Sequence, residues 1–112
     1  MTKKEYRDFV AVRVFEIMKQ SNKALTNKEI YSLVADDLRL TEEDKAAKHR
    51  SGAYKYQNNI QFGLLGLKKM GLVSQIERGI WSITEKGKAK YELLDEEYAG
   101  YQKRYWNGEI SK

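Results

Sequence analysis

The chain has 112 residues, no cysteine, one histidine and a formal net charge of +5, a size that fits one domain. The composition excludes disulfides and cysteine zinc sites, and a single histidine disfavours a catalytic zinc of the three-ligand kind. No apolar run approaches the ~18 residues of a membrane span, and no apolar segment follows the polar start as in a signal peptide, so we expect a cytoplasmic protein without membrane contact, metal or cofactor.

The first part of the chain predicts two helices joined by a minimal strand. Residues 4–20 carry an apolar face at helical spacing. This face is formed by Tyr6, Val10, Val14 and Ile17. Ala24-Leu25 is a candidate short strand. Thr26 and Glu29 have the spacing of a capping box, which predicts a second helix running to about Leu38.

The middle of the chain predicts a short helix, a loop and a longer helix. Thr41 to Asp44 is a second capping signal for a helix that fades by Lys48. A polar loop covers 49–53. Residues 56–70 are helical again, with Ile60, Leu64 and Leu67 facing inward. Gly71 is placed to end this helix.

A β-hairpin and a last helix complete the chain. Residues 72–76 and 80–83 are apolar strands around an Arg78-Gly79 turn, and the shared face of Trp81 and Ile83 predicts core positions. Thr84 caps a helix to about Trp106, roughly 33 Å long. Steps of three and four residues predict a coiled-coil seam, which favours a homodimer over packing on the first helix. The seam residues are Tyr91, Leu94, Tyr98, Tyr101 and Tyr105.

This order predicts a mainly α fold with a small β-hairpin, namely a winged helix-turn-helix with an extra long C-terminal helix. We assign residues 1–90 to the winged-helix domain and 84–107 to the C-terminal helix, a candidate dimerisation element.

Several segments, taken in order, resemble the N-terminal domain of Mrr-type restriction proteins. They are Leu40–Glu43, Ser51-Gly52, Leu67–Val73 and Arg78–Gly87. The resemblance covers roughly residues 9–91 and implies a winged helix that binds DNA, with a modified base as a possible target. A nuclease domain usually follows in that family; this sequence ends at 112 without one, so we expect cleavage to come from a partner subunit or separate domain, or not to occur.

Leu25–Tyr31 also resembles the second helix of another winged-helix group, which includes a bacterial RNA polymerase subunit domain and eukaryotic chromatin proteins. That resemblance implies a regulatory or protein-interaction role. It stands as the alternative function, and it would use the tyrosine seam together with exposed Phe62 and Leu65.

The positive charge is concentrated in one segment. Residues 45–76 hold six Lys or Arg and no Asp or Glu, whereas the parts before and after sum to −1 and 0. Such a region attracts polyanions and indicates double-stranded DNA as partner. The predicted DNA-binding residues are Lys48, His49, Arg50, Ser51, Lys55, Tyr56, Gln57, Asn58, Asn59, Gln61, Lys69 and Arg78. The Asn and Gln side chains at the start of the 56–70 helix suit bidentate hydrogen bonds to adenine. Alternatively, Asn58 or Gln57 only caps the helix.

Two features of this helix call for a neighbour. The helical spacing predicts that Phe62 and Leu65 point outward. There they could contact thymine methyls or a partner, or be covered by residues 41–57, and we expect the cover by residues 41–57. Gly63 and Gly66 weaken the helix, which indicates a close approach to its backbone. We expect no catalysis, because the nearest approach to a nuclease motif, around Asp36 and Glu43, lies in solvent-facing helical segments.

Overall fold

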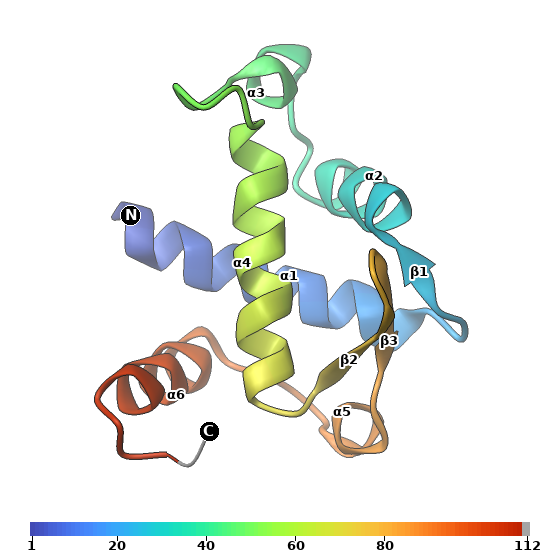
Figure 1. The fold of residues 1–112 in the computed structure, drawn as a ribbon, viewed down its shortest axis with the longest axis vertical. Helices are drawn as coiled ribbons and strands as arrows, with labels where there is room; N and C mark the ends of the chain where they lie inside the picture. Colours follow the sequence, from blue (N-terminus) through green and yellow to red (C-terminus); the bar gives the residue numbers. More distant parts are fainter. Residues whose placement is uncertain (111–112) are drawn as a thin grey trace.

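A computed structural model describes residues 1–110. The elements, in chain order, are α1 (Lys3–Gln20), β1 (Leu25–Thr26), α2 (Asn27–Asp37), α3 (Glu42–Ala46), α4 (Lys55–Lys69), β2 (Val73–Glu77), β3 (Ile80–Ile83), α5 (Glu85–Ala89) and α6 (Asp95–Trp106). Figure 1 shows α4 crossing in front of α1, with α2 and the sheet on one side and α6 on the other.

The predicted capping signals form. Thr26 and Glu29 make a reciprocal capping box at the start of α2, and Thr41 and Asp44 make another at the start of α3. In each box, a hydrogen bond from the threonine backbone lowers the pKa of the acid. The predicted helix starts are therefore confirmed.

The core lies between α1 and α4. Ile60, Leu64 and Leu67 are each at most 1 % exposed and pack with the apolar face of α1. Gly71 ends α4 with φ +76°, a conformation that favours glycine. The predicted inward face of this helix and its stop are both confirmed.

The sheet has the strand order β1-β3-β2, and all of its pairs are antiparallel. Trp81 on β3 is 2 % exposed, and Ile83 is partly buried against the same core. The Trp81 indole donates to Asn27 Oδ1 at 2.8 Å, and the Asn27 backbone N–H donates to Gly79 O at 2.9 Å. The hairpin is therefore fixed to the start of α2.

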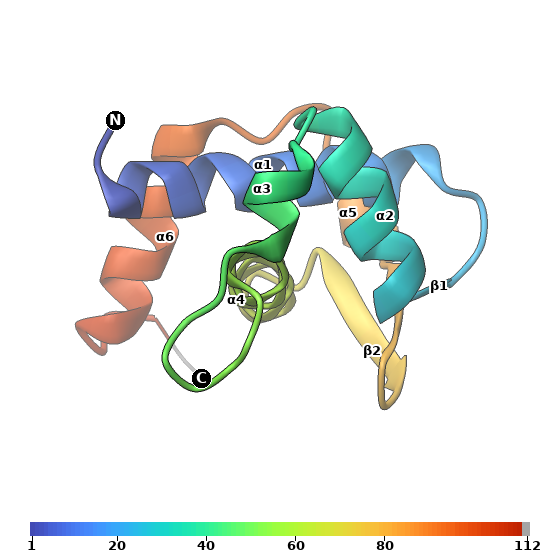
Figure 2. The same cartoon turned by 90° about the horizontal axis from the view of Figure 1, so that it is seen from above.

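Three helices (α1, α2 and α4) followed by the β2–β3 hairpin of a three-stranded sheet is the order of a winged helix. In this fold α4 has the place of the recognition helix, and β2–β3 is the wing. The short α3 is inserted before α4. The expected fold class is confirmed. Figure 2 shows the loop before α4, the wing and the end of α6 projecting on the side away from α1.

The prediction of one continuous helix from 84 to 106 is wrong. Residues 90–94 are extended between α5 and α6, because Leu93 is buried in the core and Lys19 Nζ donates to the Lys90 and Tyr91 carbonyls. Three acidic residues, 95–97, then begin α6, where they suit a helix N-terminus.

The tyrosine seam is consequently not one surface. Tyr91 and Leu94 lie exposed outside the helix. Tyr98 is 5 % exposed, and Tyr101 donates its hydroxyl to Lys69 O at 2.8 Å, so both pack within the chain. Burial raises the pKa of the Tyr98 hydroxyl. The predicted dimer seam is wrong in this form, because its central members are already covered.

Both glycines of α4 meet a close neighbour, as expected. A side-chain methyl at Gly63 would lie 3.0 Å from the Ala11 backbone of α1, and one at Gly66 would overlap the Tyr98 hydroxyl of α6. The missing side chains therefore allow two helices to cross α4 closely.

Candidate nucleic-acid interface

The loop before α4 is held in a defined shape. Lys48 and Tyr54 form an antiparallel bridge, and the His49 N–H donates to Ala53 O at 2.9 Å. The Lys55 N–H donates to Ala47 O at 3.0 Å, which closes the loop on the helix start. Exposed polar side chains therefore project from a fixed position. They are Lys48, His49, Arg50 and Ser51.

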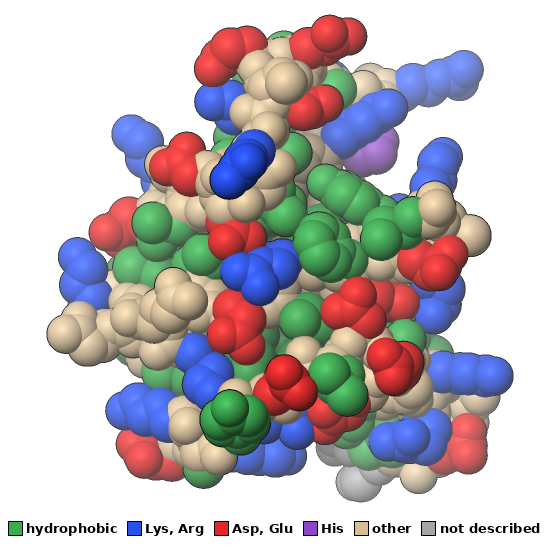
Figure 3. Space-filling model, turned by 180° about the vertical axis from the view of Figure 1, so that it is seen from behind, with side chains coloured by type: hydrophobic (Ala, Val, Ile, Leu, Met, Phe, Trp, Pro, Cys, Tyr) green, Lys and Arg blue, Asp and Glu red, His purple; other side chains and the backbone are tan. Residues whose placement is uncertain are grey.

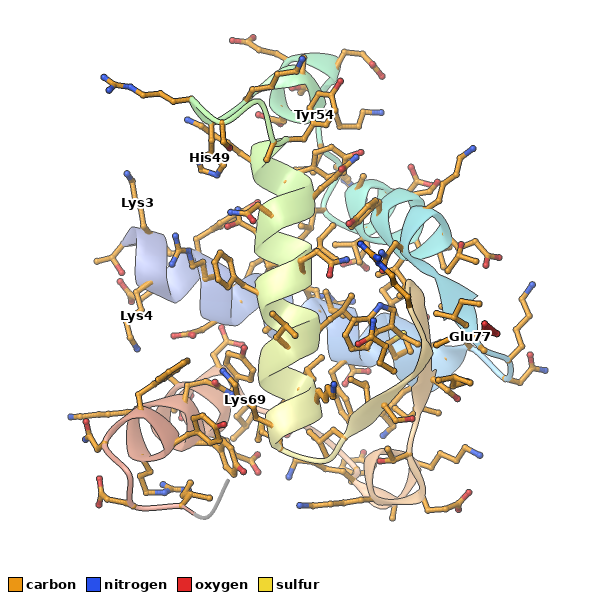
Figure 4. The ribbon with its side chains drawn as sticks, in the orientation of Figure 1. Lys3, Lys4, His49, Tyr54, Lys69 and Glu77 are labelled. Atoms are coloured by element: carbon orange, nitrogen blue, oxygen red, sulfur yellow. The ribbon has the colours of Figure 1, made fainter. Side chains whose placement is uncertain are left out.

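Beside this loop, three segments bring basic side chains together. Lys3 and Arg7 of α1, His49 of the loop and Lys55 of α4 line one depression of about 410 Å³, together with Asn59. Figure 4 shows Lys3 and His49 on the same side of α4. We call Lys3, Arg7, His49 and Lys55 the cationic cluster.

One amide lies at the rim of the cationic cluster. The Asn58 amide nitrogen is 3.5 Å from His49 Nε2, and Asn58 is half-buried. Asn58 and Asn59 thus face the same side of α4 as the cluster. A duplex whose phosphates lie on the cations would place its base edges near these two amides.

The other predicted residues at this end of α4 face α3. Lys48, Tyr56 and Gln57 line a separate depression with Glu42 and Lys45. Lys45 pairs with Glu42 at 3.0 Å, and the Lys48 ammonium lies 5.0 Å from the Tyr54 ring centre. Because an acid stands in this second depression, the cationic cluster is the better anion site.

Gln61 is not placed as a base reader. Its amide nitrogen donates to Asn27 Oδ1 at 3.1 Å and to the Tyr31 hydroxyl at 2.9 Å. It therefore links α4 to α2. Sequence position put it with the neighbouring amides, but the helical turn directs it into the fold.

Lys69 and Arg78 lie away from the cationic cluster. Lys69 is at the far end of α4, about 21 Å along the axis from Lys55, and its ammonium lies 4.1 Å from the Trp106 ring centre. Arg78 is exposed on the wing next to exposed Glu77. The cations of 45–76 therefore do not form one continuous surface.

The expected cover for Phe62 and Leu65 is wrong. They are 48 % and 45 % exposed, and they line a groove between α4, α1 and α6 rather than lying under residues 41–57. The loop precedes the helix start, whereas Phe62 and Leu65 lie seven and ten residues beyond Lys55 along α4.

Sequence reasoning missed Lys3 and Arg7. They belong to a segment whose charge sums to −1, and they precede the cationic band by some forty positions. Lys3 lies three residues before Tyr6 and seven before Val10, so it continues the line of the apolar stripe, and helical spacing gives no signal for it. The crossing of α1 behind α4 brings them to the interface.

The opposite face has a different character. Figure 3 shows acidic side chains intermingled with basic ones across this face. The depression between α1 and residues 91–96 has four acidic residues and one cation, Arg13, among its lining residues. The acids are Glu16, Glu92, Asp95 and Glu96. The molecule therefore offers a polyanion one favourable side.

Two further structural findings concern residues 1–110. No group of three or more potential metal-binding side chains comes together there. In the same range, no helix combines the length and apolar character required to cross a bilayer.

The chain matches the family described as Mrr N-terminal domain over residues 9–92, that is, 84 of its 112 residues. Neither a curated protein nor a solved structure matches it. The match contains the winged helix through Glu92, whereas α6 and the first eight residues lie outside it.

Proposed function

Because the chain belongs to the Mrr N-terminal domain family, we propose that it is the DNA-binding module of a restriction system and has no catalytic activity of its own. The supporting observation is the cationic cluster at the exposed start of the recognition helix. Its basic side chains come from α1, the loop and α4, and they lie beside two amides that suit base edges.

In this proposal the parts have different roles. The cationic cluster, with Arg50 on the adjoining loop, holds phosphates and positions the duplex. Asn58 and Asn59 contact base edges in the major groove, as the first half of a recognition helix does. The wing contributes little phosphate binding, because Glu77 offsets the charge of Arg78.

The test is duplex binding measured by fluorescence anisotropy at several salt concentrations. Four to six phosphate contacts predict a slope of log affinity against log salt of about −3.6 to −5.4. Lys55→Ala and Arg7→Ala should each weaken binding to every duplex and reduce the slope by about one. Lys88→Ala is the matched control, since this exposed lysine of α5 lies at the other end of the molecule.

Base reading is tested separately. Asn58→Ala should remove about 1–3 kcal/mol of discrimination between bases at one position of the duplex, and so change the ranking of duplex sequences. The slope of log affinity against log salt should stay unchanged. Equal loss on all duplexes would contradict base reading by Asn58. No salt-sensitive retention of any duplex would contradict DNA binding itself.

The protein-interaction alternative has less support. It relied on the tyrosine seam and on exposed Phe62 and Leu65. The burial of Tyr98 and the hydrogen bond of Tyr101 remove the centre of the seam, whereas Phe62 and Leu65 remain exposed.

A further inference from the structure

A groove between α4 and α6 lies next to the cationic cluster. It has a volume of about 790 Å³, and α1, α4 and α6 each contribute side chains to it. Those used below are Lys4, Arg7, Phe62, Leu65, Lys103 and Trp106. Figure 2 shows the end of α6 projecting to the same side of the molecule as the loop before α4.

The groove walls expose apolar and aromatic surface. Phe62, Leu65 and Trp106 are 48 %, 45 % and 68 % exposed, although each is large enough to contribute to a core. Contiguous exposed apolar groups of this kind mark binding surfaces. Two of the three present aromatic rings, on which a planar group can stack.

Cations are held against these rings. The Arg7 guanidinium lies 5.1 Å from the centre of Phe62, and the Lys69 ammonium lies 4.1 Å from that of Trp106. Lys4 and Lys103 also line the groove, and Asp8 is the only acid among its described lining residues. The groove thus suits a ligand that is both planar and anionic, which is the chemistry of a nucleotide.

Arg7 connects the two sites, because it lines both the groove and the depression of the cationic cluster. A strand whose phosphate lies at Arg7 therefore has its next base at the mouth of the groove. We propose that the α4–α6 groove binds one unpaired nucleobase of the DNA that the cationic cluster holds. This inference rests on the proposed DNA binding.

The experiment compares a fully paired short duplex with the same duplex carrying one central unpaired 2-aminopurine. We expect the wild-type protein to bind the second about tenfold more tightly, since stacking on aromatic side chains favours an unpaired base. The 2-aminopurine fluorescence should also be quenched on binding. Trp106→Ala should reduce both effects and leave affinity for the paired duplex unchanged. Phe62→Ala should also reduce both effects, and because its ring contacts Arg7 it should in addition weaken binding to the paired duplex slightly.

Two controls separate the groove from the rest. Tyr91→Ala removes an aromatic side chain that is 93 % exposed outside the groove, and it should change neither effect. Lys55→Ala should weaken binding to both duplexes equally. Unchanged helical circular dichroism would show that the variants are folded.

The outcomes are distinguishable. Equal wild-type affinity for the two duplexes, with Lys55→Ala weakening both, would overturn the groove proposal and leave DNA binding standing. Loss of all salt-sensitive duplex binding would overturn both proposals. A poly-glutamate peptide could bind the wild-type protein but not Trp106→Ala, and displace no DNA. That result would assign the groove to an acidic protein partner and overturn the proposal that it binds a nucleobase.

Discussion

The two halves of α4 differ in how they meet the rest of the molecule. The first half carries amides and a lysine, stays half-exposed and meets its neighbours through polar side chains. The second half contains two glycines over which α1 and α6 pass closely. The exposed side chains of Phe62 and Leu65 line the groove between these two helices and α4. The contacts of the first half depend on the polar groups of its side chains, whereas those of the second half depend on how closely other helices approach its backbone. Substitutions in the two halves should therefore fail differently.

The largest effect is expected at the α6 crossing. Gly66→Ala should destabilise the protein by about 2 kcal/mol, because its methyl overlaps the Tyr98 hydroxyl and overpacking outweighs the gain in helix propensity. Urea unfolding followed by the fluorescence of the two tryptophans, of which Trp81 is buried, measures the stability. Tyr98→Phe in the same chain should restore part of the loss.

A matched glycine gives the opposite sign. Gly100 is also in a helix, and the nearest atom to its missing methyl is at an ordinary 3.7 Å. Gly100→Ala should therefore stabilise by up to ~1 kcal/mol. If Gly66→Ala stabilised as well, the contrast between the two halves of α4 would be lost.

An intermediate effect is expected at the boundary of the halves. Gln61→Ala should cost about 1 kcal/mol, because it removes the hydrogen bonds to Asn27 and Tyr31. It should leave the ranking of duplex sequences unchanged, unlike Asn58→Ala. Unfolding and binding measured on the same variant check this. A changed ranking at unaltered stability would return Gln61 to the base-reading surface.

The smallest effect concerns Asp8, the acid of the groove. Burial raises its pKa, with Lys4 opposing. The folded state thus holds this proton to higher pH than the unfolded chain, so Asp8 reduces stability as pH rises through its unfolded value toward its folded one. Asp8→Asn should gain stability relative to wild type from pH 3 to 6, by less than about 1 kcal/mol. Urea midpoints at each pH provide the measurement.

Glu5 supplies a control of opposite sign for the pH experiment. Hydrogen bonds from Thr2, that of the backbone first, lower its pKa, so its contribution is present above the unfolded value and is lost as pH falls through the folded one. Glu5→Gln should therefore lose stability relative to wild type over the range in which Asp8→Asn gains it. The same direction for both variants would contradict this assignment.

Local signals were sufficient for most of the fold. Thr26 and Thr41 are each followed three residues later by the acid of a capping box, and Gly71 stands where α4 ends, so these helix bounds follow from short-range chemistry. The inward face of α4 follows from period alone. The break at 90–94 did not follow, because it depends on Lys19, some seventy residues earlier, which donates hydrogen bonds to two backbone carbonyls.

The candidate site was only partly predictable. His49, Lys55 and Asn58 were found because they are close in sequence, but Lys3 and Arg7 reach them only through the crossing of α1 and α4. Gln61 and Lys69 satisfied the charge and amide criteria and yet have partners inside the fold. A pattern in one segment specifies which side chains are available, and tertiary packing decides which of them face a ligand.

The Asn27 carboxamide has a mechanical consequence. Its oxygen accepts from Trp81 behind the wing and from Gln61 in the middle of α4, and its own backbone N–H donates to Gly79 at the hairpin turn. The wing and the recognition helix are thereby locked at a fixed mutual angle before any duplex arrives. In the DNA binding proposed above, little conformational freedom would be lost when the duplex docks, so the contact energy would contribute to affinity rather than to ordering the binding surface.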